Sequence, residues 1–164
     1  MKLFKKKTAP DPEPEVIDTL PEKLYRCGVY TQIFMDDGTV IDYDDTIKSI
    51  AEPSRAWMVP PEKVRPEFRA RRIYQYKTTE ALAQLVPEQT NEYDPNAIRV
   101  EVDGKMIGYV SGSDHDVVWP MLLYGCACLV KIYGGPHRIV CGNGETFIAP
   151  DSRMRVELTI LRND

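Results

Sequence analysis

The sequence has few of the residues that build metal centres and disulfide frameworks. Its 164 residues include two histidines and four cysteines. Four cysteines do not make the dense framework of a disulfide-stabilised secreted domain. Cys126 and Cys128 are separated by one residue, whereas zinc sites use about two to four. The sequence therefore predicts reduced cysteines, no metal site and no bound cofactor.

Sequence motifs of the common catalytic classes are also absent. The chain lacks the His-Glu-x-x-His of zinc proteases, the Gly-x-Ser-x-Gly of hydrolases and the Gly-x-x-x-x-Gly-Lys-Ser/Thr phosphate loop. Several aspartates cluster within residues 36–45, but not in the order of a calcium-binding loop, and a solvated acidic hairpin explains them more simply. We therefore predict that the protein is not an enzyme.

Long apolar runs are missing as well. The longest stretch without a charged residue is 117–130, which Pro120 and Gly125 interrupt. A helix that spans a bilayer needs about 20 apolar residues. The lysine-rich start, residues 1–7, is followed by a polar, proline-rich segment and not by the apolar core of a signal peptide. We expect a cytoplasmic protein with no membrane partner.

Positive charge is scarce overall and concentrated in one segment. Lysine and arginine number 21 against 25 acidic residues, a net charge of −4, which excludes a generally basic nucleic-acid-binding surface. Residues 62–72 nevertheless carry five basic and two acidic residues, and aromatic residues are interleaved with them as far as residue 76. Such a composition is typical of a groove for single-stranded nucleic acid, and it is equally consistent with a solvated strand face.

Proline content divides the chain into three parts. Eight of the 13 prolines precede residue 67. Residues 1–15 have nothing to bury and predict a flexible leader. Residues 16–66 predict an N-terminal extension, in which a β-hairpin around the Asp37-Gly38 turn precedes a proline-rich connector. Residues 67–164 form the remaining domain.

This last part shows the pattern of short strands with one helix. Residues 68–77 alternate apolar with polar side chains, as a half-buried strand does. We also expect hairpins at 97–110 and 137–149, strands at 126–133 and 153–161, and a helix at 117–124. The pattern predicts a mainly β protein with one or two short helices, folded as a small β-barrel with an N-terminal hairpin extension.

One segment carries a more specific pattern. The block Asn-x-Tyr-Asp-Pro-Asn-Ala-Ile at 91–98 is followed by a strand, an Asp-Gly turn at 103–104 and Ile-Gly-Tyr-Val at 107–110. This arrangement resembles the HIRAN domain, a module found alone in bacteria and phages and at the N-terminus of SWI/SNF-type helicase-like ATPases. The resemblance makes 67–164 a HIRAN-like domain. It implies an OB-like barrel that binds single-stranded DNA, preferring a free 3′-hydroxyl end in the best-understood member.

The resemblance also implies roles for individual residues. Tyr93 would stack on the terminal base, Asp94 would accept a hydrogen bond from the 3′-hydroxyl, and Asn91 would bind nearby. An aromatic side chain from the first barrel strand would close the other side of the base, and either Tyr74 or Tyr76 fits that role. The candidate nucleic-acid-binding residues are Asn91, Tyr93, Asp94, Tyr74, Tyr76, Arg69, Arg71, Arg72 and Tyr109.

Two functions from different classes remain open. The first is a non-enzymatic module that binds single-stranded DNA or DNA 3′ ends in DNA processing or repair, together with a DNA-processing protein partner. The alternative is a protein-interaction module in which the barrel binds a peptide or a partner domain. The turn after Tyr109 favours the alternative, because it holds Asp114 and Asp116 where the family's DNA-binding member has lysines.

Overall fold

The computed structural model describes residues 23–162, so the leader expected at 1–15 lies outside the described residues. The elements follow one another as β1 (Lys23–Tyr30), β2 (Gln32–Phe34), β3 (Val40–Asp42), α1 (Asp44–Ile50), β4 (Arg72–Tyr74), β5 (Thr79–Pro87), β6 (Ile98–Val102), β7 (Lys105–Val110), α2 (His115–Leu123), β8 (Cys126–Gly134), β9 (His137–Val140), β10 (Thr146–Ala149) and β11 (Met154–Arg162).

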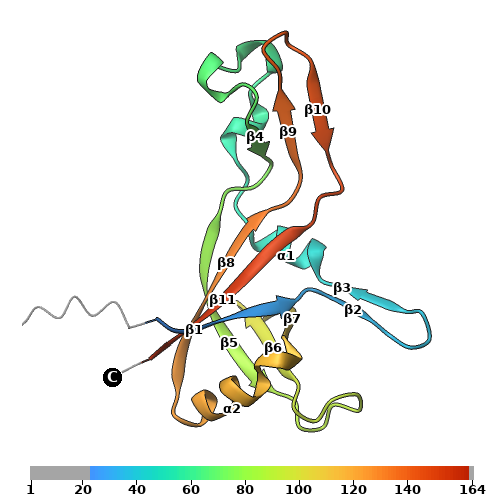
Figure 1. Cartoon of the computed structure of the whole chain (residues 1–164), viewed down its shortest axis with the longest axis vertical. Coiled ribbons are helices and arrows are strands. Elements are labelled where there is room, and N and C mark those ends of the chain that lie inside the picture. The colour runs from blue at the N-terminus through green and yellow to red at the C-terminus, as the bar shows by residue number, and fades with distance from the viewer. Residues whose placement is uncertain (1–22, 163–164) are drawn as a thin grey trace, which may run out of the picture.

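Six of these strands close into a barrel in the order β1-β11-β8-β5-β6-β7, with every pair antiparallel. The long strands β8 and β11 pair from Met154 opposite Gly134 to Arg162 opposite Cys126. Alternate residues of β8 and β11 are buried, as in a strand with one face toward a core. The mainly β fold with a small barrel and two short helices is thus confirmed (Figure 1).

The first barrel strand is β1, which comes from the segment before residue 67. Its first part pairs with β11, and Val29 and Tyr30 pair with Val110 and Tyr109 of β7. Gly108 makes this closure possible, because a Cβ there would lie 2.2 Å from the carbonyl oxygen of Tyr30. The strand before the Asp37-Gly38 turn of the expected hairpin is therefore divided into β1 and β2, and only β2 pairs with β3 around that turn.

The prediction of a barrel strand over 68–77 is wrong. Only Arg72–Tyr74 is a strand there, and it pairs with β9 outside the barrel. Three-10 turns that begin at Pro61 and Pro66 occupy the preceding residues, because proline suits the first position of a helical turn. The strand that enters the barrel is β5, which begins at Thr79, directly after this segment.

We call the three-stranded sheet β10-β9-β4, with the three-10 helices η1 (Arg55–Met58), η2 (Pro61–Lys63) and η3 (Pro66–Phe68), the small lobe. It extends from one end of the barrel in Figure 1. Its core consists of Val64, Ile73 and Val140. The buried Arg138 donates to the backbone carbonyls of Ala56 and Val59 and so ties η1 to the sheet.

Two helices complete the fold. Helix α1, within the segment expected as a connector, buries Ile47, and Lys48 pairs with Asp44 at 2.8 Å. Helix α2 begins two residues before the expected start and contains Pro120. In the part of the chain that the structure describes, no helix is long and apolar enough to cross a membrane.

Candidate nucleic-acid interface

The polar block of the sequence forms the loop between β5 and β6, and its side chains hold that loop together. The Asn91 Oδ1 accepts from the backbone N–H groups of Tyr93 at 2.9 Å and Asp94 at 3.0 Å. The Asp94 Oδ1 in turn accepts from the N–H of Asn96 at 2.8 Å. These are the local side-chain turns that Asn and Asp favour. Asn91 therefore orients the two residues expected to touch a ligand.

Glu88 anchors the start of this loop, and the sequence analysis did not identify it. Its carboxylate accepts hydrogen bonds from Asn91 at 3.0 Å, Tyr109 at 2.9 Å and Arg99 at 3.0 Å. Burial raises the pKa of Glu88, but these donors outweigh burial and the net pKa is lowered. The three partners come from different elements, so no local motif marks Glu88.

Tyr109 is fixed by the same contact. Burial and the hydrogen bond to Glu88 raise the pKa of Tyr109 to about 12. Its hydroxyl is therefore committed to the protein, and its ring is the part left for a ligand.

A cavity of about 300 Å³, at the lower end of the usual range for ligand pockets, lies beside this loop. We call it the aromatic pocket. Tyr93 on the loop is 78% exposed and Tyr30 at the end of β1 is 53% exposed. Tyr30 and Tyr109 are register partners, so both rings project from the same face. The lining residues are Tyr30, Ile33, Met35, Ile41, Asn91, Tyr93, Asp94, Ala97, Tyr109, Val110, Gly112 and His115.

One side of the aromatic pocket is polar. The Asp94 Oδ2, which takes no part in the turn, lies 3.6 Å from the Nδ1 of His115. The other ring nitrogen of the buried His115 lies 3.3 Å from the carbonyl oxygen of Val110. Asp94 remains partly exposed, so this oxygen can still accept a hydrogen bond from a ligand. Among residues 23–162, no lysine or arginine lines the pocket.

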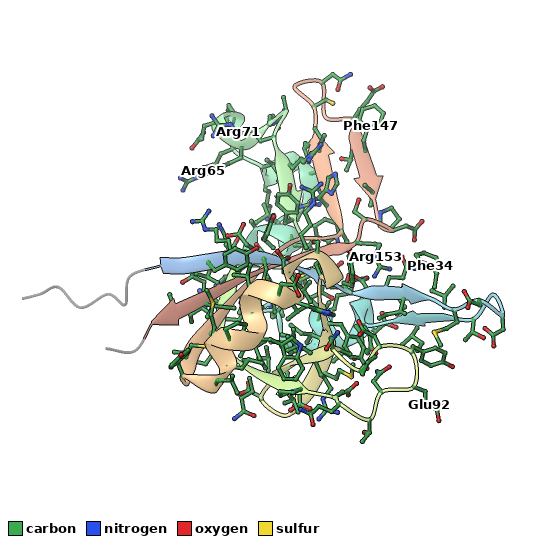
Figure 2. All side chains as sticks on the ribbon, turned by 60° about the horizontal axis from the view of Figure 1, so that its bottom comes forward. Phe34, Arg65, Arg71, Glu92, Phe147 and Arg153 are labelled. Carbon is green, nitrogen blue, oxygen red and sulfur yellow. The ribbon has the colours of Figure 1, made fainter. Side chains whose placement is uncertain are left out.

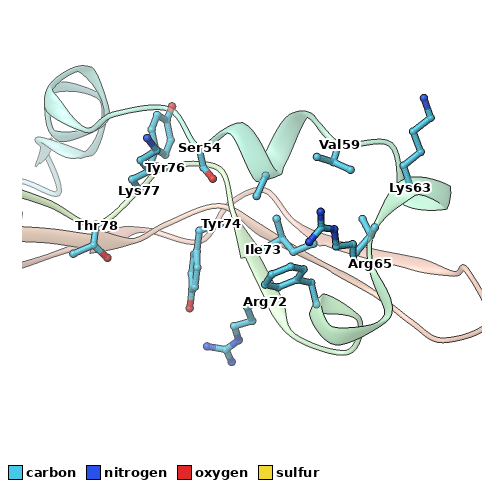
Figure 3. Close-up of a pocket in the computed structure, with 13 residues that line it drawn as sticks. Ser54, Val59, Lys63, Arg65, Arg72, Ile73, Tyr74, Tyr76, Lys77 and Thr78 are labelled. Carbon is cyan, nitrogen blue, oxygen red and sulfur yellow. The ribbon is translucent and has the colours of Figure 1, made fainter.

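The structure does not bring all the predicted site residues together. Tyr74, Tyr76 and Arg72 line a separate cavity of about 530 Å³ in the small lobe (Figure 3). Figure 2 shows Arg65 and Arg71 on this lobe, at the opposite end of the molecule from Glu92 of the β5–β6 loop.

The aromatic residue expected from the first barrel strand is therefore neither Tyr74 nor Tyr76. That strand is β1, and the residue it contributes to the pocket is Tyr30. Sequence reasoning missed Tyr30 because the small lobe separates β1 from the next barrel strand along the chain.

The predicted arginines have different roles in the structure. Arg69 donates to the backbone carbonyls of Val64 at 3.2 Å and Gly142 at 3.0 Å, so it holds the small lobe together. Arg71 is exposed and lines neither the aromatic pocket nor the cavity in the lobe. Arg72 does line the lobe cavity.

The fold is a small closed antiparallel barrel with an aromatic pocket beside its β5–β6 loop. Within residues 23–162 no group of three or more His, Cys, Asp or Glu side chains is placed to hold a metal ion. Residues 69–149 match the family model of the HIRAN domain, and the chain is a HIRAN domain protein. No curated protein and no solved structure matches the chain.

The family defines the function in coarse terms. The HIRAN domain is in general a DNA-binding module and is not catalytic by itself, which is consistent with nucleic-acid binding by this chain. The matched residues begin after β1, so the strand that carries Tyr30 lies outside them.

Proposed function

We propose that the aromatic pocket binds the 3′-hydroxyl end of single-stranded DNA, and that the protein thereby positions a DNA-processing partner in DNA processing or repair. The observation that carries the proposal is the pair of exposed rings, Tyr30 and Tyr93, that line one cavity together with the Asp94 carboxylate. Stacking a base on an aromatic side chain contributes about 1–3 kcal/mol and tolerates any base.

The charge of the pocket supports selection of a chain end. A carboxylate repels phosphate, and none of the described residues that line the pocket is a lysine or arginine to offset Asp94. A terminal hydroxyl, in contrast, can donate to Asp94 Oδ2, and such a charge-assisted hydrogen bond contributes about 1.5–3 kcal/mol. In this proposal Asp94 accepts a hydrogen bond from the hydroxyl, and Asn91 is the positioning residue that fixes Asp94.

A titration with two matched oligonucleotides tests this. Fluorescein-labelled oligo(dT) ending in a 3′-hydroxyl or a 3′-phosphate is titrated at about 50 mM salt, where phosphate contacts are strong. We expect the wild type to prefer the hydroxyl end by at least about 10-fold, the equivalent of about 1.4 kcal/mol. Asp94→Asn should remove most of this preference, because a neutral amide no longer repels the phosphate.

Glu92→Gln is the matched control, since Glu92 is an exposed acid on the same loop that does not line the pocket. It should keep the preference. Equal binding of both ends by the wild type and also by Arg72→Gln, which removes a basic residue of the small lobe, would show that Asp94 is not an end sensor. No binding of either oligonucleotide would refute nucleic-acid binding by this pocket.

A second candidate is recognition of a peptide or partner domain by the same pocket. The pocket lacks basic residues, and Ile33, Met35 and Ile41 of the β2–β3 hairpin make one side of it apolar. A pulldown from nuclease-treated extract distinguishes the two candidates. A protein that remains bound to the wild type but not to Tyr93→Ala would support peptide recognition.

A further inference from the structure

Basic residues are gathered on the small lobe and on the barrel residues beside it, Lys77, Arg153 and Arg155. The cavity of about 530 Å³ and a neighbouring cavity of about 300 Å³ share Arg72 and Tyr74 in their walls. We call the two together the lobe channel. Among the residues that the structure describes, its lining includes no aspartate or glutamate, although the chain as a whole has a net charge of −4. The basic residues that line it are Lys63, Arg65, Arg72, Lys77, Arg153 and Arg155.

Most of these charges are available to a ligand. Lys63, Arg72, Lys77 and Arg155 form no ion pair with any residue that the structure describes, and all four are exposed. Arg65 lies 3.9 Å from Glu67, and an exposed pair of this kind contributes only about 0–1 kcal/mol. Arg153 is the exception, because it forms hydrogen bonds to both carboxylate oxygens of Asp42, at 2.5 and 2.8 Å.

Aromatic rings stand among these charges. Arg72 and Tyr74 project from the same face of β4, because they are two residues apart on a strand, while Ile73 between them is buried (Figure 3). The exposed Phe68 lines the larger cavity, and Tyr133 lines the smaller one beside Arg155. Rings interleaved with unpaired cations are the composition of a single-strand groove, where bases stack and phosphates meet Lys and Arg.

We propose that the lobe channel is a second nucleic-acid site, which binds the phosphates and bases of an internal stretch of single strand. The two sites differ in what they can recognise. The aromatic pocket has no cation to release counterions from a phosphate chain, whereas the channel has several. An acidic peptide would satisfy the cations but would offer few rings to Tyr74 and Phe68. The channel has no carboxylate to sense a terminus, so it binds regardless of the end group.

The test uses a probe that the aromatic pocket disfavours. The full chain is titrated with fluorescein-labelled oligo(dT) ending in a 3′-phosphate, over about 50–200 mM salt. Arg72→Gln should weaken binding about 5–10-fold at the lowest salt. It should also reduce the salt slope, the slope of log affinity against log salt concentration, by about 0.7 for each phosphate that Arg72 neutralises in the wild type. Tyr74→Ala should weaken binding with the salt slope unchanged, since it removes stacking and no charge.

Arg55→Gln is the matched control. Arg55 is an exposed arginine of the same lobe that lines neither cavity, so its replacement should change the affinity by less than about 2-fold. Circular dichroism and thermal melting of each variant establish that the lobe is folded.

Three results would overturn the proposal. The first is that the wild type fails to bind the 3′-phosphate probe. The second is that Arg72→Gln and Arg55→Gln weaken binding equally. The third is that polyglutamate of equal charge displaces the probe while Tyr74→Ala binds the probe as well as the wild type does. The last result would assign the channel to an acidic polypeptide. The end preference is also compared between Arg72→Gln and the double variant Arg72→Gln/Asp94→Asn, in which channel binding is weakened. The aromatic pocket is thus tested apart from the channel, so failure of one site is distinguishable from failure of the other.

Discussion

The barrel and the small lobe bury very different amounts of the chain. The barrel core contains fifteen buried residues, including Ile107, Ile132 and Ile160, and its longest strands have nine residues. The lobe core contains three buried residues, and its strands have three or four. Burial of apolar area is the main source of stability. The barrel thus supplies the stable framework, and the lobe is a small structure that presents charge.

The two regions also differ in their binding surfaces. Within residues 23–162, the aromatic pocket is lined by tyrosines and a carboxylate but by no lysine or arginine, whereas six basic residues and no acid line the lobe channel. If both proposals hold, recognition of an end and attraction of the phosphate chain are functions of separate sites. Asp94 would be hard to keep beside phosphates, and the basic residues would weaken its preference for a hydroxyl.

The largest effect that we predict separates the stabilities of the two regions. Ile132→Ala in the barrel should lower the free energy of unfolding by about 2–5 kcal/mol, because it leaves a cavity in a closed core. Ile73→Ala, the matched change in the lobe, should accelerate amide hydrogen exchange in β4 and β9 and leave β8 and β11 protected. Urea unfolding and hydrogen exchange measure these effects. Equal loss of protection in both regions would show that they unfold as one unit.

The next effect concerns the rings of the aromatic pocket. Tyr93→Ala should weaken binding of 3′-hydroxyl oligo(dT) by about 5–150-fold, the equivalent of about 1–3 kcal/mol of stacking. Its melting temperature should not change, because Tyr93 is 78% exposed. Tyr124→Ala removes a ring that is 88% exposed and lies outside the pocket, so it serves as the control. Similar weakening in both variants would mean that Tyr93 has no special role.

A smaller effect is expected at the anchor of the β5–β6 loop. Glu88→Gln should cost about 1.5 kcal/mol of stability at neutral pH, since it weakens charge-assisted hydrogen bonds from Arg99, Asn91 and Tyr109. The lowered pKa of Glu88 means that its contribution is present above the ordinary pKa of 4.5 and is lost as pH falls through the folded value. The difference between variant and wild type in urea unfolding should therefore shrink in acid. A difference that is constant with pH would contradict this assignment.

The smallest predicted effect concerns the ion pair between Asp42 of the β2–β3 hairpin and Arg153, which directly precedes β11. The hydrogen bond from Arg153, with help from the N–H of Asp44, lowers the pKa of Asp42 from 3.8 to about 2. A lowered pKa gives stability that is present above pH 3.8 and is lost as pH falls toward 2. Asp42→Asn should cost less than about 1 kcal/mol at neutral pH, because the pair is partly exposed. Urea unfolding should show the difference between variant and wild type shrinking as pH falls below 3.8 toward 2.

Several parts of the fold could be predicted because their signals are local. The hairpins at 97–110 and 137–149 carry turn residues between strand-forming runs, and the structure confirms both. Strand β5 was missed, since three of its residues, Thr79, Ala81 and Ala83, are small side chains that give a weak alternation signal. Helix α1 was missed because seven residues give too short a periodic pattern.

The sequence by itself determined the β5–β6 loop, because its hydrogen bonds join residues two or three apart: Asn91 to Tyr93 and Asp94, and Asp94 to Asn96. Only the tertiary structure decided which ring joins Tyr93. Tyr30 lies in β1, and it reaches the pocket through pairing with β7, which Gly108 permits. The tertiary structure also decided where the arginines lie, since β4 pairs with β9 and carries them into the lobe. Pairing between distant strands depends on the closure of the whole barrel, and no local pattern contains it.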